Sequence, residues 1–191
     1  LVKTGRLLIP KSKKSSSDWF VHLCERALKY TTTCVFSNKM THITLLSDFG
    51  LHDASAGVVK GILLGVLPNA VITDLSHEVR PYRTDEAAYL LGSAYKAFGE
   101  GCVHVVLTDI YYDAVPRLIL CQQGNQYFMS PDNGVVPMAL GKLPDSAWLC
   151  MELTKDKTFK DWLVQTAQTI RMLTATTPDN AGLQPITAKR I

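Results

Sequence analysis

The chain has 191 residues, with 20 Lys and Arg against 17 Asp and Glu, which is a formal net charge of +3. A hydrophobic fraction of 47% and a charged fraction of 19% exclude an intrinsically disordered chain and are typical of globular proteins. No apolar run approaches the roughly 18 residues of a membrane helix, so we expect no membrane partner. The five cysteines are an odd number without a C-x-x-C pair, which argues against a disulfide framework or zinc knuckle and favours a reducing, cytoplasmic location.

The charge is unevenly distributed along the chain. Residues 1–39 carry eight basic and two acidic side chains, whereas residues 40–191 carry 12 basic and 15 acidic ones. We interpret residues 1–39 as a leader that is disordered or foreign to the domain, with Met40 as an alternative translation start. An organellar targeting segment and a basic binding arm are the alternatives. Because the excess basic charge belongs to this leader, we expect no nucleic-acid partner for the domain.

Strand-like and helix-like patterns alternate from His42 onward. His42–Ser47 is predicted to be a buried strand, followed by a helix at Asp53–Leu67, where apolar residues recur at helical spacing. Ala70–Leu75 is predicted to be a second strand. The next helix is predicted at Thr84–Phe98 with Thr84 as its N-cap, and Cys102–Thr108 is a third strand. This order predicts α/β layering around a parallel sheet.

The second half of the chain continues with a hairpin and a helix. Arg117–Gln122 and Gln126–Met129 are predicted to be two strands joined by a tight turn, and Thr158–Leu173 is predicted to be a helix. The predicted fold is an α/β three-layer sandwich with a mostly parallel central sheet, formed by residues 40–175.

Acidic and amide side chains follow several of the predicted strands. Asp48 follows the first strand, Asp109 follows the third, and Asn133 lies in a later Pro-Asp-Asn-Gly turn. In parallel α/β sheets ligands bind at the carboxyl ends of the strands, and a carboxylate there can accept two hydrogen bonds from a ribose diol. The alternative is that these residues only cap helices and form turns.

Several common site motifs are absent from the sequence. It contains no G-x-G-x-x-G, no phosphate-binding P-loop, no G-x-S-x-G elbow and no histidine spacing of a metal site, so no cofactor or metal is predicted. His104 alternates within a strand and is interpreted as a structural residue. His77 follows a strand end, where a functional role and a capping or turn role are equally compatible with the pattern.

Four ordered motifs closely resemble one family, the S-adenosyl-L-methionine (SAM) hydroxide adenosyltransferases, which are related to SAM-dependent fluorinase and chlorinase. The motifs are ITLLSDFG at 43–50, AVITDLSHEVRPY at 70–82, CVHVVLTD at 102–109 and YFMSPDNGVV at 127–136. The resemblance spans about His42 to Ile170. It implies a homotrimer when full length, with SAM bound between an N-terminal α/β domain and a neighbour's C-terminal β-barrel. We therefore expect residues 176–191 to begin a linker toward a barrel that is absent from this chain, either because the sequence is truncated or because the protein has lost its second domain.

The resemblance also implies roles for individual residues. Asp48 matches the carboxylate that binds the ribose hydroxyls, and Asp109 matches the catalytic aspartate that acts on water. Asp53 and Ser55 match a loop that lies close to the ligand, and Tyr82 matches the position where the halogenases place an aromatic ring against the sugar. Asn133 lies in the matching Pro-Asp-Asn-Gly turn. SAM enters this scheme as the substrate and no cofactor is required.

The sequence departs from the family at two catalytic positions. The glycine-rich loop after the catalytic aspartate is replaced by a tyrosine-containing one, and the family arginine falls on Pro116, so that Arg117 would serve only with a shifted loop. The family histidine is replaced by Lys160. Halogenation is disfavoured because Asp109 would repel a halide.

Two main functions follow from the resemblance. The first is hydrolysis of SAM to adenosine and L-methionine, impaired in this chain because half of the family pocket is missing. The second is non-catalytic binding of SAM or adenosine, and a structural module without ligand is a weaker third possibility.

Overall fold

The computed structural model describes residues 41–189, so the predicted leader at 1–39 lies outside the described residues. The chain order alternates strands and helices through the first half and ends with antiparallel strands. The elements are β1 (His42–Ser47), α2 (Ser55–Val66), β2 (Val71–Ser76), α3 (Thr84–Ala94), a 3₁₀ turn η1 (Tyr95–Ala97), β3 (Val103–Leu107), β4 (Arg117–Gln123), β5 (Gln126–Pro131), α4 (Val135–Leu140), β6 (Ser146–Glu152), α5 (Phe159–Leu173) and β7 (Gln184–Pro185).

A seven-stranded mixed sheet forms the centre of the domain, in the order β2-β1-β3-β5-β4-β6-β7. Strand β1 pairs in parallel with β2 and β3, and β3 pairs in parallel with β5. Strand β4 runs antiparallel to both of its neighbours, β5 and β6. The predicted α/β sheet is therefore confirmed, with parallel pairing from β2 to β5 and antiparallel pairing from β5 through β4 and β6 to β7. Because the chain crosses from β2 over β1 to β3, the strand order reverses direction at the carboxyl ends of β1 and β3, which is where such sheets bind ligands.

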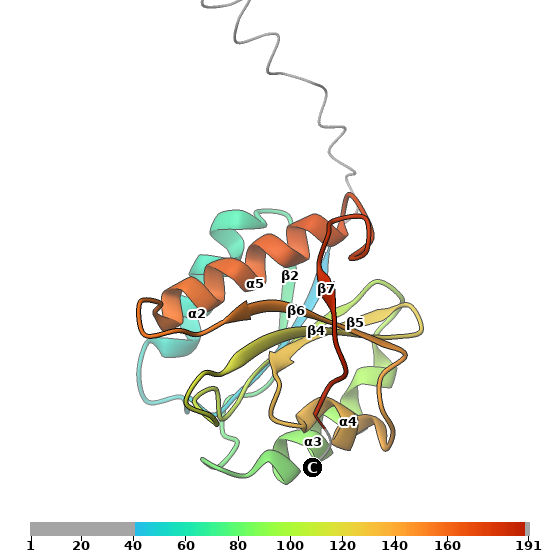
Figure 1. Cartoon of the computed structure of the whole chain (residues 1–191). Coiled ribbons are helices and arrows are strands. Elements are labelled where there is room, and N and C mark those ends of the chain that lie inside the picture. The colour runs from blue at the N-terminus through green and yellow to red at the C-terminus, as the bar shows by residue number, and fades with distance from the viewer. Residues whose placement is uncertain (1–40, 190–191) are drawn as a thin grey trace, which may run out of the picture. The chain divides into compact units, whose positions relative to one another are not determined.

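Helices cover both faces of the sheet, as Figure 1 shows, and each face has its own apolar core. Helices α2 and α5 lie on one face, where Leu63 and Trp162 are fully buried. Helices α3 and α4 lie on the other, with Leu91 and Val135 in its core. Strand β3 is buried along its whole length because it is covered on both sides. This three-layer arrangement was predicted from the sequence and is confirmed.

The α3 prediction requires two corrections. The helix begins at Thr84, but its N-cap is Arg83, and no side chain caps it. Its α-helical part ends at Ala94 and continues only as the 3₁₀ turn η1, short of the predicted end at Phe98. The longer prediction was wrong because apolar spacing does not distinguish the last α-helical turn from a 3₁₀ turn.

Three elements were not predicted from the sequence: α4, β6 and β7. Helix α4 has six residues and contains Pro137, and glycines in the left-handed conformation bound it at 134 and 141. Such a short segment cannot show helical periodicity. Strand β6 continues the sheet beyond the hairpin, and the two-residue β7 pairs with it.

The chain after α5 returns along the sheet. Beyond β7 the Ile186 N–H donates to the carbonyl of Ala147 at 2.9 Å, and Ala188 is buried. Part of the segment 176–191, predicted as the start of a linker, therefore packs on the domain as far as Lys189. In the described part of the chain no helix is both long and apolar enough to cross a bilayer.

Candidate functional site

The carboxyl ends of three neighbouring strands bring Asp48, Asp109 and Asn133 together. Asp48 directly follows β1, and its Oδ2 accepts a hydrogen bond from the backbone N–H of Asp109, which follows β3, at 2.8 Å. The Asn133 side chain follows β5 and donates from Nδ2 to the carbonyl of Thr108 at 3.1 Å. These contacts link the three strand ends at the point where the strand order reverses.

Two non-glycine residues in loops that follow strands have positive φ angles. Within residues 41–189 they are Asp109, with φ of 48°, and Tyr82, with φ of 60°. Such conformations cost free energy and persist where surrounding structure imposes them, typically at functional sites. At Asp109 the hydrogen bond to the Asp48 carboxylate is one contact that holds this backbone in place.

The site carries uncompensated negative charge. Burial raises the pKa of the Asp109 carboxyl above its ordinary value, and the nearby charge of Asp48 raises it further. In the described part of the chain neither carboxylate takes part in an ion pair. This pair can therefore attract a cation, accept hydrogen bonds from hydroxyl groups, or take a proton from water.

Asp53 and Ser55 lie at the start of α2. The Ser55 N–H donates to Oδ1 of Asp53 at 2.8 Å, and this backbone hydrogen bond lowers the pKa of the Asp53 carboxyl. Both residues are only a few positions beyond Asp48. A bond of this kind commonly forms where an aspartate precedes a helix. The contacts of Asp53 and Ser55 are therefore those of residues that begin α2.

Tyr82 lies in the turn that precedes α3. The residue is 85% exposed, and within residues 41–189 its side chain makes no hydrogen bond. In this part of the chain no hydrogen bond or ion pair therefore links the Tyr82 side chain to the two aspartates.

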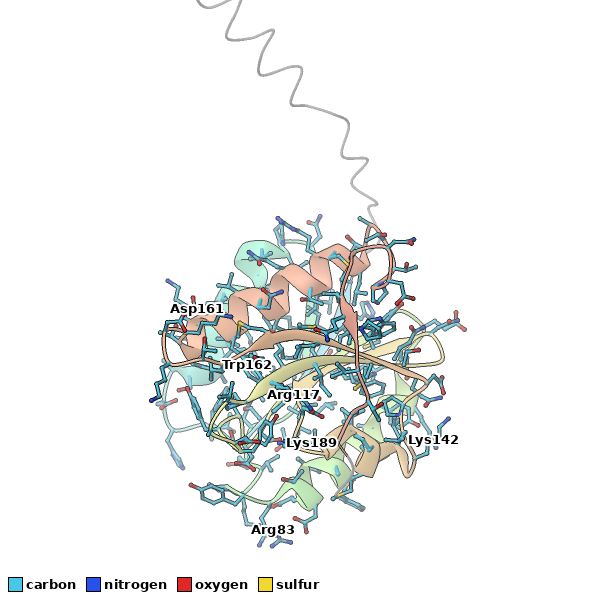
Figure 2. The ribbon with its side chains drawn as sticks, viewed as in Figure 1. Arg83, Arg117, Lys142, Asp161, Trp162 and Lys189 are labelled. Carbon is cyan, nitrogen blue, oxygen red and sulfur yellow. The ribbon has the colours of Figure 1, made fainter. Side chains whose placement is uncertain are left out.

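Arg117 is held by a residue that the sequence analysis did not single out. Its guanidinium pairs with Oδ2 of Asp132, a carboxylate whose side chain is 1% exposed. The other Asp132 oxygen accepts the backbone N–H of Lys189 at 2.8 Å. Figure 2 labels Arg117 and Lys189, which come from β4 and the C-terminal segment. In the described part of the chain Arg117 has no ion pair with Asp109.

The loop between Asp109 and Arg117 contacts both Arg117 and Lys189. The hydroxyl of Tyr112 accepts the Arg117 backbone N–H at 3.1 Å, and Lys189 Nζ lies 4.8 Å from the centre of the Tyr112 ring. The Lys189 ammonium also pairs with Asp113 at 3.2 Å. The signal that could have identified Asp132 is its place beside Asn133 in the Pro-Asp-Asn-Gly turn.

The segment that carries Lys160 begins next to the Asp48 turn. Phe159 packs edge-on against Phe49, with ring centres 5.6 Å apart. Thr158 caps α5 in a capping box with Asp161, and the Lys160 side chain is exposed. The predicted Thr-Phe-Lys segment thus starts α5 and lies close to the first strand end.

Comparisons with known proteins agree on one family. The family model described as the SAM hydroxide adenosyltransferase N-terminal domain matches residues 43–182. An (R)-S-adenosyl-L-methionine hydrolase of Methanocaldococcus jannaschii is 33% identical over 106 residues, covering 53% of this chain and 40% of the relative. A fluorinase of Nocardia brasiliensis is 33% identical over 66 residues, covering 35% and 22%.

Solved structures show the same fold. A conserved hypothetical protein from Thermus thermophilus superimposes with a TM-score of 0.63 at 28% identity, covering 80% of this chain and 62% of the other. An uncharacterized conserved protein from Thermotoga maritima gives a TM-score of 0.64 at 25% identity, covering 78% and 60%. The chain spans about 40% of the length of the first curated relative that it matches.

Proposed function

Because this chain belongs to the SAM hydroxide adenosyltransferase family, we propose that it binds SAM at the Asp48–Asp109 edge and promotes attack of water on the ribose C5′. The products are adenosine and L-methionine. The observation that carries the proposal is the contact between the two aspartates at the carboxyl ends of β1 and β3. Relatives named (R)-S-adenosyl-L-methionine hydrolase support this choice among reactions.

The charge of the site suits the proposed substrate. SAM is a sulfonium cation, and the two carboxylates make no ion pair within the described residues, so their charge is available to it. Asp48 is assigned to the ribose hydroxyls, because a carboxylate can accept both hydrogen bonds of a vicinal diol. In the proposed complex Asn133 keeps the β3 and β5 ends together through its hydrogen bond to Thr108.

Asp109 is assigned to the water. Its raised pKa makes it a stronger base than an ordinary exposed carboxylate. The methionine leaving group of a sulfonium is already activated, so positioning water in line with the C–S bond is the main requirement. Such positioning can supply roughly 7–11 kcal/mol of a reaction barrier.

A second candidate function is binding without turnover. The observation that favours it is the pairing of Arg117 with Asp132, which directs the guanidinium away from the role predicted for it. The replacement of the family histidine by Lys160 points the same way. We propose that turnover by this chain is slow because the two partners of Asp109 are altered. The homotrimer and the cytoplasmic location remain predictions.

Calorimetry with SAM and adenosine, followed by chromatography of products formed in ¹⁸O-water, tests the proposal. We expect SAM binding by the wild type and incorporation of ¹⁸O into the 5′-hydroxyl of released adenosine. Asp109→Asn should reduce product formation by roughly 10²–10⁴-fold with binding retained, as expected for loss of a general base. Asp48→Asn should weaken the binding of both ligands.

A matched control is Asp145→Asn, which removes one carboxylate at the β4–β5 hairpin, away from the strand ends. It should leave binding and turnover unchanged. Tight SAM binding without any product would support the second function, and the absence of binding to either ligand would refute both.

A further inference from the structure

A chain of four side chains leads from the candidate site to the surface. The Ser47 hydroxyl and Nδ1 of His77 are 2.7 Å apart, and Nε2 of His77 lies 3.2 Å from Oδ1 of Asp74. The other Asp74 oxygen pairs with Nζ of Lys60 on α2 at 2.5 Å. These residues come from the end of β1, the turn after β2, β2 itself and α2. We call this group the Ser47–Lys60 chain.

The order serine, histidine, aspartate is that of a nucleophilic triad, but the surroundings of Ser47 exclude that role. Ser47 is 0% exposed and His77 is 4% exposed, so a substrate carbonyl cannot approach the hydroxyl. A nucleophilic serine must reach its substrate and an oxyanion site at the same time. The Ser47–Lys60 chain must therefore act by holding a neighbouring residue in place.

The residue that it holds is Asp48. On one side of Asp48, Ser47 is bonded to the His77 ring. On the other side, the N–H of Gly50 donates to the His77 carbonyl at 2.6 Å. Gly50 has a φ of 74°, which lets the turn close back on the His77 backbone. One residue, His77, thus binds both flanks of the turn that carries Asp48.

We propose that His77 is a positioning residue that fixes the Asp48 carboxylate against the backbone of Asp109. The Asp48 Oδ2 accepts the Asp109 N–H, and this bond requires the turn at 47–50 to keep its place. Asp74 and Lys60 lie on the solvent side of the imidazole ring. Their effect is smaller, because Nε2 of His77 approaches Asp74 without a well-directed hydrogen bond and both side chains are more than a third exposed. The proposal rests on the proposed function only where it concerns ligand affinity.

The Asp109 amide gives a direct readout, because its hydrogen bond ends on Asp48. Amide hydrogen exchange of ¹⁵N-labelled protein, measured by NMR, should be roughly three- to tenfold faster at Asp109 in His77→Ala than in wild type. His77→Asn should restore the slow exchange, because an Asn side-chain atom can occupy the place of Nδ1 beside Ser47. Ser47→Ala removes the same hydrogen bond from the other side and should give a similar acceleration.

His104 supplies a matched control. Its Nδ1 is 2.8 Å from the hydroxyl of Thr44, also on β1, and its ring is 0% exposed. His104→Ala therefore removes a bond of the same kind between a buried histidine and a β1 hydroxyl, but not at the Asp48 turn. It should lower global stability without selectively accelerating exchange at Asp109 relative to core amides such as that of Val105.

Calorimetry with adenosine tests whether the positioning role affects ligand affinity. His77→Ala should weaken adenosine binding roughly three- to tenfold, and His77→Asn should bind within about twofold of wild type. If wild-type protein binds neither SAM nor adenosine, the proposed function fails, and the exchange experiment still decides the positioning role. If Asp109 exchange is unchanged in both His77→Ala and Ser47→Ala, the positioning role is overturned, whatever the ligand results. Ser47→Ala also serves if His77→Ala does not fold.

Discussion

His104 makes the stability of the domain depend on pH. Its imidazole is fully buried, is stacked on Phe128 with ring centres 4.9 Å apart, and bonds through Nδ1 to Thr44. The rings of Tyr95 and Phe98 meet it edge-on. Burial lowers the pKa of His104 from 6.5 to about 4, because a charged imidazolium would lose its hydration there.

The sign of the effect follows from the lowered pKa. The unfolded chain binds a proton at His104 below pH 6.5, whereas the folded chain does so only near pH 4. Protonation therefore favours unfolding, so the contribution of the neutral ring is complete above pH 6.5 and is lost as the pH falls toward 4. Between pH 7 and pH 5 the loss is about 2 kcal/mol. That is a large fraction of the roughly 5–15 kcal/mol that stabilises a typical domain.

Urea unfolding of wild type and His104→Asn at pH 8, 7, 6 and 5 measures this loss. The variant is less stable at every pH because it leaves a cavity, but the test is how each free energy changes with pH. Wild type should lose about 2 kcal/mol more than the variant between pH 7 and pH 5, and the two curves should run parallel from pH 7 to 8. Carboxylates contribute to both proteins and cancel in the difference. Equal losses, or a His104 NMR titration with a pKa near 6.5, would refute the reasoning.

Three other substitutions test the packing and capping of the helices by chemical unfolding. Gly92→Ala should destabilise the domain by about 1–3 kcal/mol, because its Cβ would lie 2.8 Å from the carbonyl oxygen of Ala139 where α3 meets α4. Gly61→Ala in α2 meets nothing within 4 Å and should stabilise by up to about 1 kcal/mol through helix propensity; equal effects of the two would contradict this account. Thr158→Ala removes the α5 cap and should cost about 1 kcal/mol, and an unchanged midpoint would show that the capping box with Asp161 contributes nothing.

The strand ends show which parts of the site local sequence could predict. Parallel strands end at one edge, so the positions of Asp48 and Asp109 after two apolar runs were enough to predict that both would lie at that edge. Their direct contact, in which the Asp109 amide donates to the Asp48 carboxylate, depends on the positive φ of Asp109, and that angle leaves no pattern in the sequence. His77 could be noticed for the same positional reason, but not its bonds to Ser47 and Gly50.

For Arg117 the sequence predicted the strand but not the partner of its side chain. The start of β4 was predicted at this residue and lies there. Its partner, Asp132, comes just after β5, the other strand of the hairpin, and only the antiparallel register of that hairpin brings the two together. The second hydrogen-bond donor to Asp132 is the backbone N–H of Lys189, which is 57 residues farther along the chain. No spacing rule connects residues so distant in the chain.

The sequence by itself determined the layers of this protein, because apolar periodicity reports directly which side of a strand or helix must avoid water. It also placed polar residues after β1, β3 and β5, because the apolar run of each strand ends there. Only the tertiary structure decided the partners: Arg117 with Asp132, His77 with Ser47, and Asp48 with the Asp109 amide. Hydrogen bonds and ion pairs need angles and distances that arise only when strands far apart in the chain are set in register.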